Sequence, residues 1–143
     1  MNKLDATRRA MLLGAFAMSA TRCASAQTFD QEWRGAMGGG PNQSTELARE
    51  TADWNILWSR LRQPTPAPLP AGAMAVGITL GTRPTGGFGI RVDSARPENG
   101  VFVVTWSEVA PAPGTFVTQA LTDPYLVRLF PRTDLPVRVQ KAG

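Results

Sequence analysis

Carboxylates are the main groups through which residues 27–143 offer acid–base chemistry, because the one lysine among these residues, Lys141, stands close to the end of the sequence. The chain has no histidine, and its single cysteine, Cys23, lies in the N-terminal segment described below. Serine–histidine and cysteine–histidine nucleophile systems are therefore excluded for these residues, and so are zinc sites built from histidine and cysteine. Two carboxylates can act together as an acid–base pair in hydrolysis. The candidates are Asp93, Glu98, Glu108, Asp123 and Asp134.

The spacing of these five carboxylates places no two of them together. We expect them to be solvent-exposed on strands and turns, where acidic side chains are usually found. The sequence therefore predicts a protein without catalytic residues, cofactor or metal, and an enzyme that uses carboxylates alone is one alternative. A ligand-binding module with Trp106 and Tyr125 as stacking platforms is another, although both aromatic residues are expected in the core.

Residues 1–26 have the organisation of an export signal. A basic start is followed by an apolar stretch too short to span a bilayer and by an Ala-x-Ala cleavage pattern at residues 24–26. The pair Arg8-Arg9 is typical of twin-arginine signals. Arg22, just before the cleavage pattern, favours that route over the Sec pathway, which is the alternative.

The export signal predicts a periplasmic or secreted protein after cleavage near Ala26. A lipid anchor at Cys23 is disfavoured, because Arg22 stands where a lipoprotein signal has a small residue. We therefore expect Cys23 to leave with the signal, and we expect no stable membrane anchor.

Most of the net positive charge belongs to this leader. The chain has 15 Lys and Arg against 11 Asp and Glu, a net charge of +4 and a pI of about 10.2. The leader holds Lys3, Arg8, Arg9 and Arg22 against Asp5 alone. The remainder is therefore nearly neutral, and no basic surface for nucleic acid is expected.

Residues 51–61 carry the pattern of an amphipathic helix. Thr51 is a candidate cap for the free backbone amides, and Asp53 and Arg60 complement the helix dipole at the two ends. Residues 63–70 follow, with proline at every second position from 64 to 70, and predict an extended polyproline II connector. The apolar positions of the helix recur at helical spacing and are Trp54, Leu57, Trp58 and Leu61.

The remaining segments predict strands and turns. Asn99-Gly100 predicts a hairpin turn, and residues 101–106, apolar on both faces, predict a central strand. In the predicted strand over residues 74–80, one face carries the small residues Ala75, Gly77 and Thr79, which leave room for the tryptophan-rich helix. The predicted strands cover residues 44–50, 74–80, 88–93, 101–106, 115–120, 125–130 and, as an edge strand, 137–139.

These elements predict an α+β, mainly β fold: an antiparallel sheet or small sandwich of about five to seven strands with one short tryptophan-rich helix. The predicted organisation is an export signal over residues 1–26, an N-terminal strand and loop segment over 27–50, and a β-rich domain over 51–143.

The loop over residues 81–87 is the segment most suited to recognition. A phosphate-binding loop is excluded, because the required lysine and the following helix are missing. We expect a hairpin connection in which Gly86-Gly87 supplies positive φ and Arg83 and Thr85 project at the tip. The alternative is a turn with no role beyond connecting two strands.

Five short motifs follow one another along the chain. They are Trp54-x-x-x-Trp58, Val76-Gly77-Ile78-Thr79-Leu80-Gly81, Arg83-Pro84-Thr85-Gly86-Gly87-Phe88-Gly89-Ile90, Pro111-x-x-Gly114 and Leu121-Thr122-Asp123-Pro124-Tyr125. Taken together, these motifs resemble the C-terminal domain of the PrcB family, in which tyrosine is more common at the position of Phe88. The resemblance covers roughly residues 51–131 and rests on the order of the motifs rather than on any one of them.

The family takes its name from a small subunit of a secreted subtilisin-like protease complex, which associates with the catalytic subunit and stabilises it. The resemblance implies a non-catalytic exported accessory domain that binds a partner protein, with a protease as one candidate. An edge strand of the sheet is a further contact surface. The expected partner-binding residues are Arg83, Pro84, Thr85, Gly86, Gly87 and Phe88.

An inhibitor is the alternative function for the same loop. The segment Pro84-Thr85-Gly86-Gly87-Phe88 is similar to the loop with which chagasin-like inhibitors bind cysteine proteases. The similarity extends to one loop only, because the other binding loops of that family are not found in this sequence.

Overall fold

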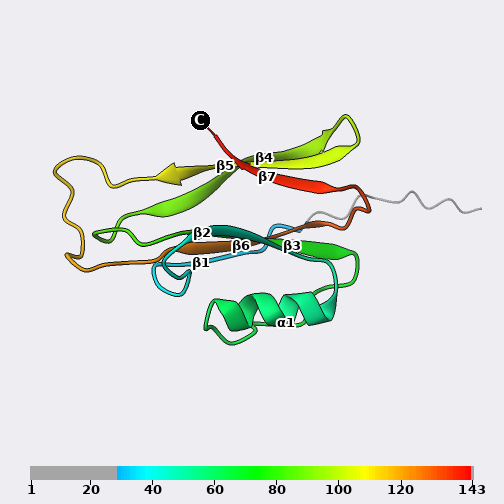
Figure 1. Cartoon of the computed structure of the whole chain (residues 1–143), viewed down its shortest axis with the longest axis horizontal. Helices are drawn as coiled ribbons and strands as arrows, with labels where there is room; N and C mark the ends of the chain where they lie inside the picture. Colours follow the sequence, from blue (N-terminus) through cyan, green and yellow to red (C-terminus); the bar gives the residue numbers. More distant parts are fainter. Residues whose placement is uncertain (1–28, 143) are drawn as a thin grey trace, which may run out of the picture.

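The computed structural model describes residues 29–142, which form two β-sheets and one helix (Figure 1). The predicted mainly β fold is confirmed, whereas the predicted export signal and Cys23 lie outside the described residues. In chain order the elements are β1 (Glu32–Gly35), β2 (Gln43–Ala48), α1 (Thr51–Arg60), β3 (Ala73–Leu80), β4 (Gly89–Glu98), β5 (Val101–Val109), β6 (Tyr125–Pro131) and β7 (Val137–Lys141).

The first sheet is antiparallel and has the strand order β1-β6-β3-β2. Helix α1 covers one of its faces and the second sheet covers the other (Figure 1). Every residue of β3 is buried, because this strand has a neighbour on both edges and a layer on both faces. Such double burial explains why its sequence is almost wholly apolar.

The helix packs on the small-residue face of β3, as predicted. A Cβ on Gly77 would lie only 2.7 Å from Cδ1 of Leu57, so glycine is what allows this approach. Trp33 of β1 joins Trp54 and Trp58 in a cluster of edge-to-face rings with centroids 5.5 to 5.7 Å apart. These contacts form a core of their own between helix and sheet.

The helix begins at Thr51, but the predicted capping role of Thr51 is wrong. The N-cap residue is Glu50, and its side chain makes no capping hydrogen bond. Asp53 in the first turn and Arg60 in the last turn do complement the helix dipole. Arg60 also donates two hydrogen bonds of 2.7 Å to Glu46 of β2.

The second sheet has the order β4-β5-β7, with β5 in the centre as predicted. Asn99 and Gly100 have φ of 52° and 81°, the positive values of a two-residue hairpin turn between β4 and β5. Strand β7 pairs with β5 in parallel and is the edge strand expected near the end of the sequence. The core between the two sheets contains Trp106, Ile78 and Leu126.

Two local predictions are wrong, and one strand was not predicted. Residues 115–120 form no strand, because they pair with neither sheet over any length. Residues 81–87 do not close a hairpin, because β3 and β4 lie in different sheets. Strand β1 was not predicted, and its four residues owe their extended form to pairing with β6 far along the chain.

Candidate partner-binding site

Residues 82–88 cross from the first sheet to the second at one end of the sandwich. The crossing lies beside the long connection between β5 and β6, at the left end of the molecule in Figure 1. Gly87 has φ +90° as predicted, a value strained for residues with a side chain, whereas Gly86, for which positive φ was also predicted, does not have it. A Cβ on Gly87 would lie 2.8 Å from Cβ of Pro111, so the two segments are in close contact.

Hydrogen bonds fasten the crossing to this long connection. Arg83 and Thr122 exchange backbone N–H to C=O bonds of 2.7 and 2.9 Å, and the Gly86 N–H donates to the Thr118 carbonyl at 2.9 Å. The Thr122 hydroxyl donates to the carbonyl of Thr85, also at 2.9 Å. Residues 82–88 and 110–122 therefore act as one unit, which we call the paired loops.

The Arg83 side chain is tied down instead of projecting from a tip, so that expectation is wrong. Its Nε donates to Oε2 of Glu108 at 2.7 Å and a second guanidinium nitrogen donates to Oε1 at 3.0 Å. Lys141 Nζ donates to the same Oε1 at 3.1 Å. The Arg83 side chain is 23% exposed. This bidentate pair fixes the start of the paired loops on the second sheet.

The two cations also shift the ionisation of Glu108. Hydrogen bonds from Arg83, and to a lesser extent from Lys141, lower the pKa of Glu108 from 4.5 to about 2 against the opposing effect of burial. The same pairing raises the pKa of Arg83. A carboxylate with a lowered folded pKa contributes stability that is complete above its unfolded pKa and is lost as the pH falls through the folded value.

We expect Glu108→Gln to remove a pH-dependent part of the stability. The advantage of the natural protein over this variant should shrink by about 1–2 kcal/mol as the pH falls from 5 toward 2, allowing for solvent screening of a partly exposed pair. Urea unfolding at a series of pH values measures this. Glu98→Gln removes an exposed ion pair with Arg96 and is the matched control, for which no comparable change is expected. An advantage that is constant between pH 5 and 2 contradicts the assignment.

The paired loops carry exposed apolar side chains that were not predicted as site residues. Phe116 is fully exposed and Leu121 is also exposed, and Val109, the last residue of β5, is exposed directly before the second loop. Residues 109–122 contain no charged side chain. The signal in the sequence is this uncharged run with Pro111 and Pro113, although its second half predicts a strand over residues 115–120.

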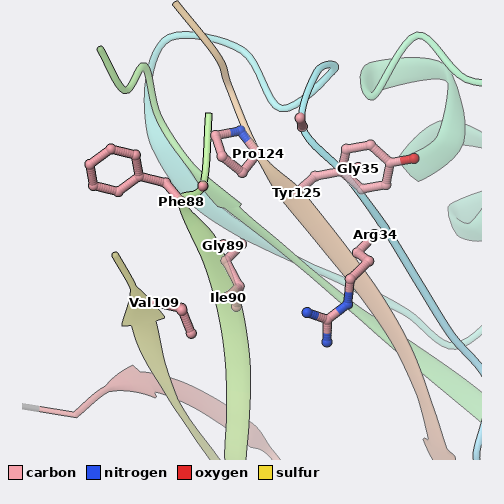
Figure 2. Close-up of a pocket in the computed structure, with 10 residues that line it drawn as sticks. Arg34, Gly35, Phe88, Gly89, Ile90, Val109, Pro124 and Tyr125 are labelled. Atoms are coloured by element: carbon pink, nitrogen blue, oxygen red, sulfur yellow. The ribbon is translucent and has the colours of Figure 1, made fainter. Parts of the chain in front are cut away.

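A pocket of about 400 Å³ opens beside the paired loops. Figure 2 shows Phe88 and Arg34 on opposite sides of it. We call it the end pocket, and of the predicted site residues only Gly87 and Phe88 contribute to it. It is lined by Arg34, Gly35, Ala36, Gly87, Phe88, Gly89, Ile90, Val109, Pro124 and Tyr125.

The candidate carboxylates do not face one another across a cleft. Asp93 accepts hydrogen bonds from Arg91 and Ser107, of which the Arg91 bond contributes most to the lowering of its pKa. Glu98 pairs with Arg96. The part of the chain that the structure describes contains no group of three acidic, histidine or cysteine residues placed to hold a metal ion.

Asp123 and Asp134, the other two candidates, have different surroundings. Asp123 accepts backbone N–H bonds from Gly38 at 3.1 Å and Gly40 at 2.9 Å and pairs with Arg62, so its carboxylate holds a glycine turn. Asp134 is exposed.

The two aromatic residues considered as stacking platforms are buried. Trp106 belongs to the core between the sheets, where Lys141 lies over its ring. Tyr125 packs against Trp58 in the helix core, and burial raises the pKa of its phenol. Only Tyr125 reaches a pocket, as part of the end pocket wall.

Helix α1 has ten residues, and within residues 29–142 there is no helix with the length and hydropathy of a membrane span.

No curated protein and no solved structure matches the chain. Residues 74–128 match the family described as PrcB C-terminal. The matched segment runs from β3 into β6 and includes both paired loops. The resemblance noted in the sequence is thereby confirmed over residues 74–128.

Proposed function

We propose that this protein is an exported, non-catalytic accessory protein that binds a partner protein through the paired loops, the end pocket and the neighbouring edge of the second sheet. The PrcB C-terminal match supports an accessory role associated with a protease. An exported protease is therefore the first candidate for the partner. The twin-arginine leader and a periplasmic or secreted location are parts of the same proposal.

One observation carries the proposal: Phe116 is fully exposed on a loop whose neighbours Thr118 and Thr122 are hydrogen-bonded into the sandwich. Exposed apolar groups on a fixed backbone are typical of interaction sites, because the partner need not order the loop on binding. Leu121 and Val109 extend the same uncharged surface. The predicted residues Arg83 to Phe88 then contribute mainly as support, with Phe88 alone offering a large apolar side chain.

The inhibitor alternative rests on residues 84–88 and requires them to enter a protease cleft. The Gly86 N–H and the Thr85 carbonyl are already bonded to residues 118 and 122. Such a loop is less able to reshape for a narrow cleft than a free hairpin tip. The accessory role therefore fits the geometry better.

Affinity purification from the native host tests the proposal. The full chain with a C-terminal tag should recover an exported partner after mild cross-linking. The variants Phe116→Ser and Phe88→Ala should each reduce recovery by about 5- to 30-fold, the effect of removing an interface residue worth 1–2 kcal/mol. Phe116→Ser should keep the melting temperature of the natural protein, since Phe116 is exposed. Phe88→Ala should lower the melting temperature modestly, since Phe88 is half-buried and packs against the core between the sheets, and its recovery is therefore measured at a temperature where the variant is folded.

Ile56→Ser is the matched control, because Ile56 is an exposed apolar residue on α1, on the opposite layer. The amount of partner recovered with Ile56→Ser should equal the amount recovered with the natural protein. Equal recovery with all three variants contradicts the proposal. Inhibition of a papain-like protease by the natural protein, lost on shortening the loop over residues 82–87, would favour the inhibitor instead.

A further inference from the structure

The outer edge of β4 has no strand beside it. Strand β4 pairs only with β5, at one side of the sheet order β4-β5-β7. The end pocket lies at the start of this strand, beside Gly89 and Ile90. A second pocket of about 260 Å³ lies further along the same strand, lined by residues 92–95 together with Phe29, Asp30, Arg128 and others.

We infer that this edge binds the free C-terminal end of an extended polypeptide, with the last side chain in the end pocket, the terminal carboxylate at the backbone of Gly87 and Phe88, and Arg34 across the pocket as the cation that attracts it. The inference rests on the proposed function, since it names the chemistry of the partner segment at the same site. Strand addition and capture of a terminal carboxylate are both established modes of peptide recognition.

The end pocket has the composition that such a chain end requires. Its wall is mainly apolar, with Phe88, Ile90 and Tyr125 among the lining residues, and Arg34 is the one charged residue among those described there. Arg34 shares the single carboxylate of Glu32 with Arg128. Arg34 is thus the one cation that lines this apolar cavity, and a cation beside an apolar wall complements an apolar residue that bears a carboxylate.

The backbone ahead of β4 is free to donate. Among residues 29–142, no acceptor is found for the N–H groups of Gly87 and Phe88. Gly89 leaves the approach open, because a Cβ built on it meets no atom within 4 Å. Backbone N–H groups at a glycine-rich turn are suitable donors for a carboxylate.

The position of these donors sets the direction of the bound chain. They precede β4, so a carboxylate placed there requires the bound segment to run antiparallel to the strand. The residues of the bound segment that precede its C-terminus then lie along β4, with a rise of about 3.4 Å per residue. They reach the second pocket at Val92–Ala95 after about four residues. Pairing must end before Pro97, which has no N–H to donate.

Peptide binding by fluorescence anisotropy tests the inference on the full chain after export. The probe is a pool of fluorescein-labelled hexapeptides with mixed residues at the first five positions and Leu, Val or Phe at the last. Saturable binding is expected for the pool with free carboxylates, and amidation of the C-terminus should weaken it about 10-fold or more. A pool that ends in Asp should also bind at least about 10-fold more weakly.

Two variants examine the site itself. Arg34→Met should weaken binding about 5-fold or more, whereas Arg138→Met on β7 should leave it unchanged. Gly89→Val should block the approach to the end pocket, with Thr45→Val on the distant edge strand β2 as its control. If Gly89→Val fails to fold, the comparison of free and amidated pools with Arg34→Met still decides the question.

Equal affinity for free and amidated pools overturns the inference, as does the absence of saturable binding or an unchanged affinity for Arg34→Met. The two proposals fail separately. A partner that is recovered through Phe116 while no peptide binds refutes only the carboxylate site. Peptide binding with recovery that is insensitive to Phe116 and Phe88 refutes only the wider contact surface.

Discussion

Trp54→Ala is expected to lower the free energy of unfolding by about 3–5 kcal/mol, a large part of the total stability of a domain of this size. Trp54 has no exposed surface and packs edge to face with Trp33 and Trp58. Its Nε1 also donates a 2.8 Å hydrogen bond to the carbonyl of Ala67. The substitution therefore opens a cavity and at the same time releases the proline-rich connector.

Urea unfolding followed by circular dichroism measures this effect. Ile56→Ala on the same helix is the control, because Ile56 is 49% exposed and its loss should change stability by less than about 0.5 kcal/mol. A cost below about 1 kcal/mol for Trp54→Ala would show that α1 contributes little to the stability of the first sheet.

Asp123→Ala is expected to cost about 2–4 kcal/mol, because it leaves backbone N–H groups of Gly38 and Gly40 without their acceptors. The substitution also removes the ion pair with Arg62. The glycine turn is held to the same place by the Gly39 N–H, which donates to the Asp123 carbonyl at 2.8 Å, and this bond should remain. Because Pro124 and Tyr125 follow at once, loosening this turn should also disturb the end pocket.

Thermal and urea unfolding measure the cost of Asp123→Ala, with Asp134→Ala as the control at an exposed carboxylate. The control should stay within about 0.5 kcal/mol of the natural protein. Asp123→Asn keeps one acceptor oxygen, so its free energy of unfolding should lie between the values for Asp123→Ala and for the control. Equal stability of Asp123→Ala and Asp134→Ala would contradict the assignment of Asp123 as the residue that holds the turn.

The local patterns were sufficient for the helix and the central strands. Spacing of the tryptophans predicted the buried face of α1, and small residues of β3 predicted where that helix packs. The Asn99-Gly100 pair predicted its turn because positive φ is a property of those residues themselves. In each case the deciding interaction lies within a few residues along the chain.

Sheet membership and the geometry of the site were not predictable in this way. Strands β3 and β4 resemble the two arms of a hairpin in sequence, yet the core between the sheets separates them. Residues 115–120 alternate like a strand but have no neighbouring strand to pair with. The pairing of Arg83 with Glu108 joins residues on different segments, so the chain alone indicated a projecting cation where the structure has a fastened one.

The three-layer arrangement has a consequence for how the molecule opens. Strands β3 and β6 lie at its centre, covered by the helix on one face and by the second sheet on the other. We expect their amide protons to exchange with deuterium only when the whole domain unfolds, and the outer amides of the edge strand β4 to exchange in the native state. Rigidity is thus greatest at the centre of the molecule, and a segment that settles beside β4 would protect amides that the isolated domain leaves open.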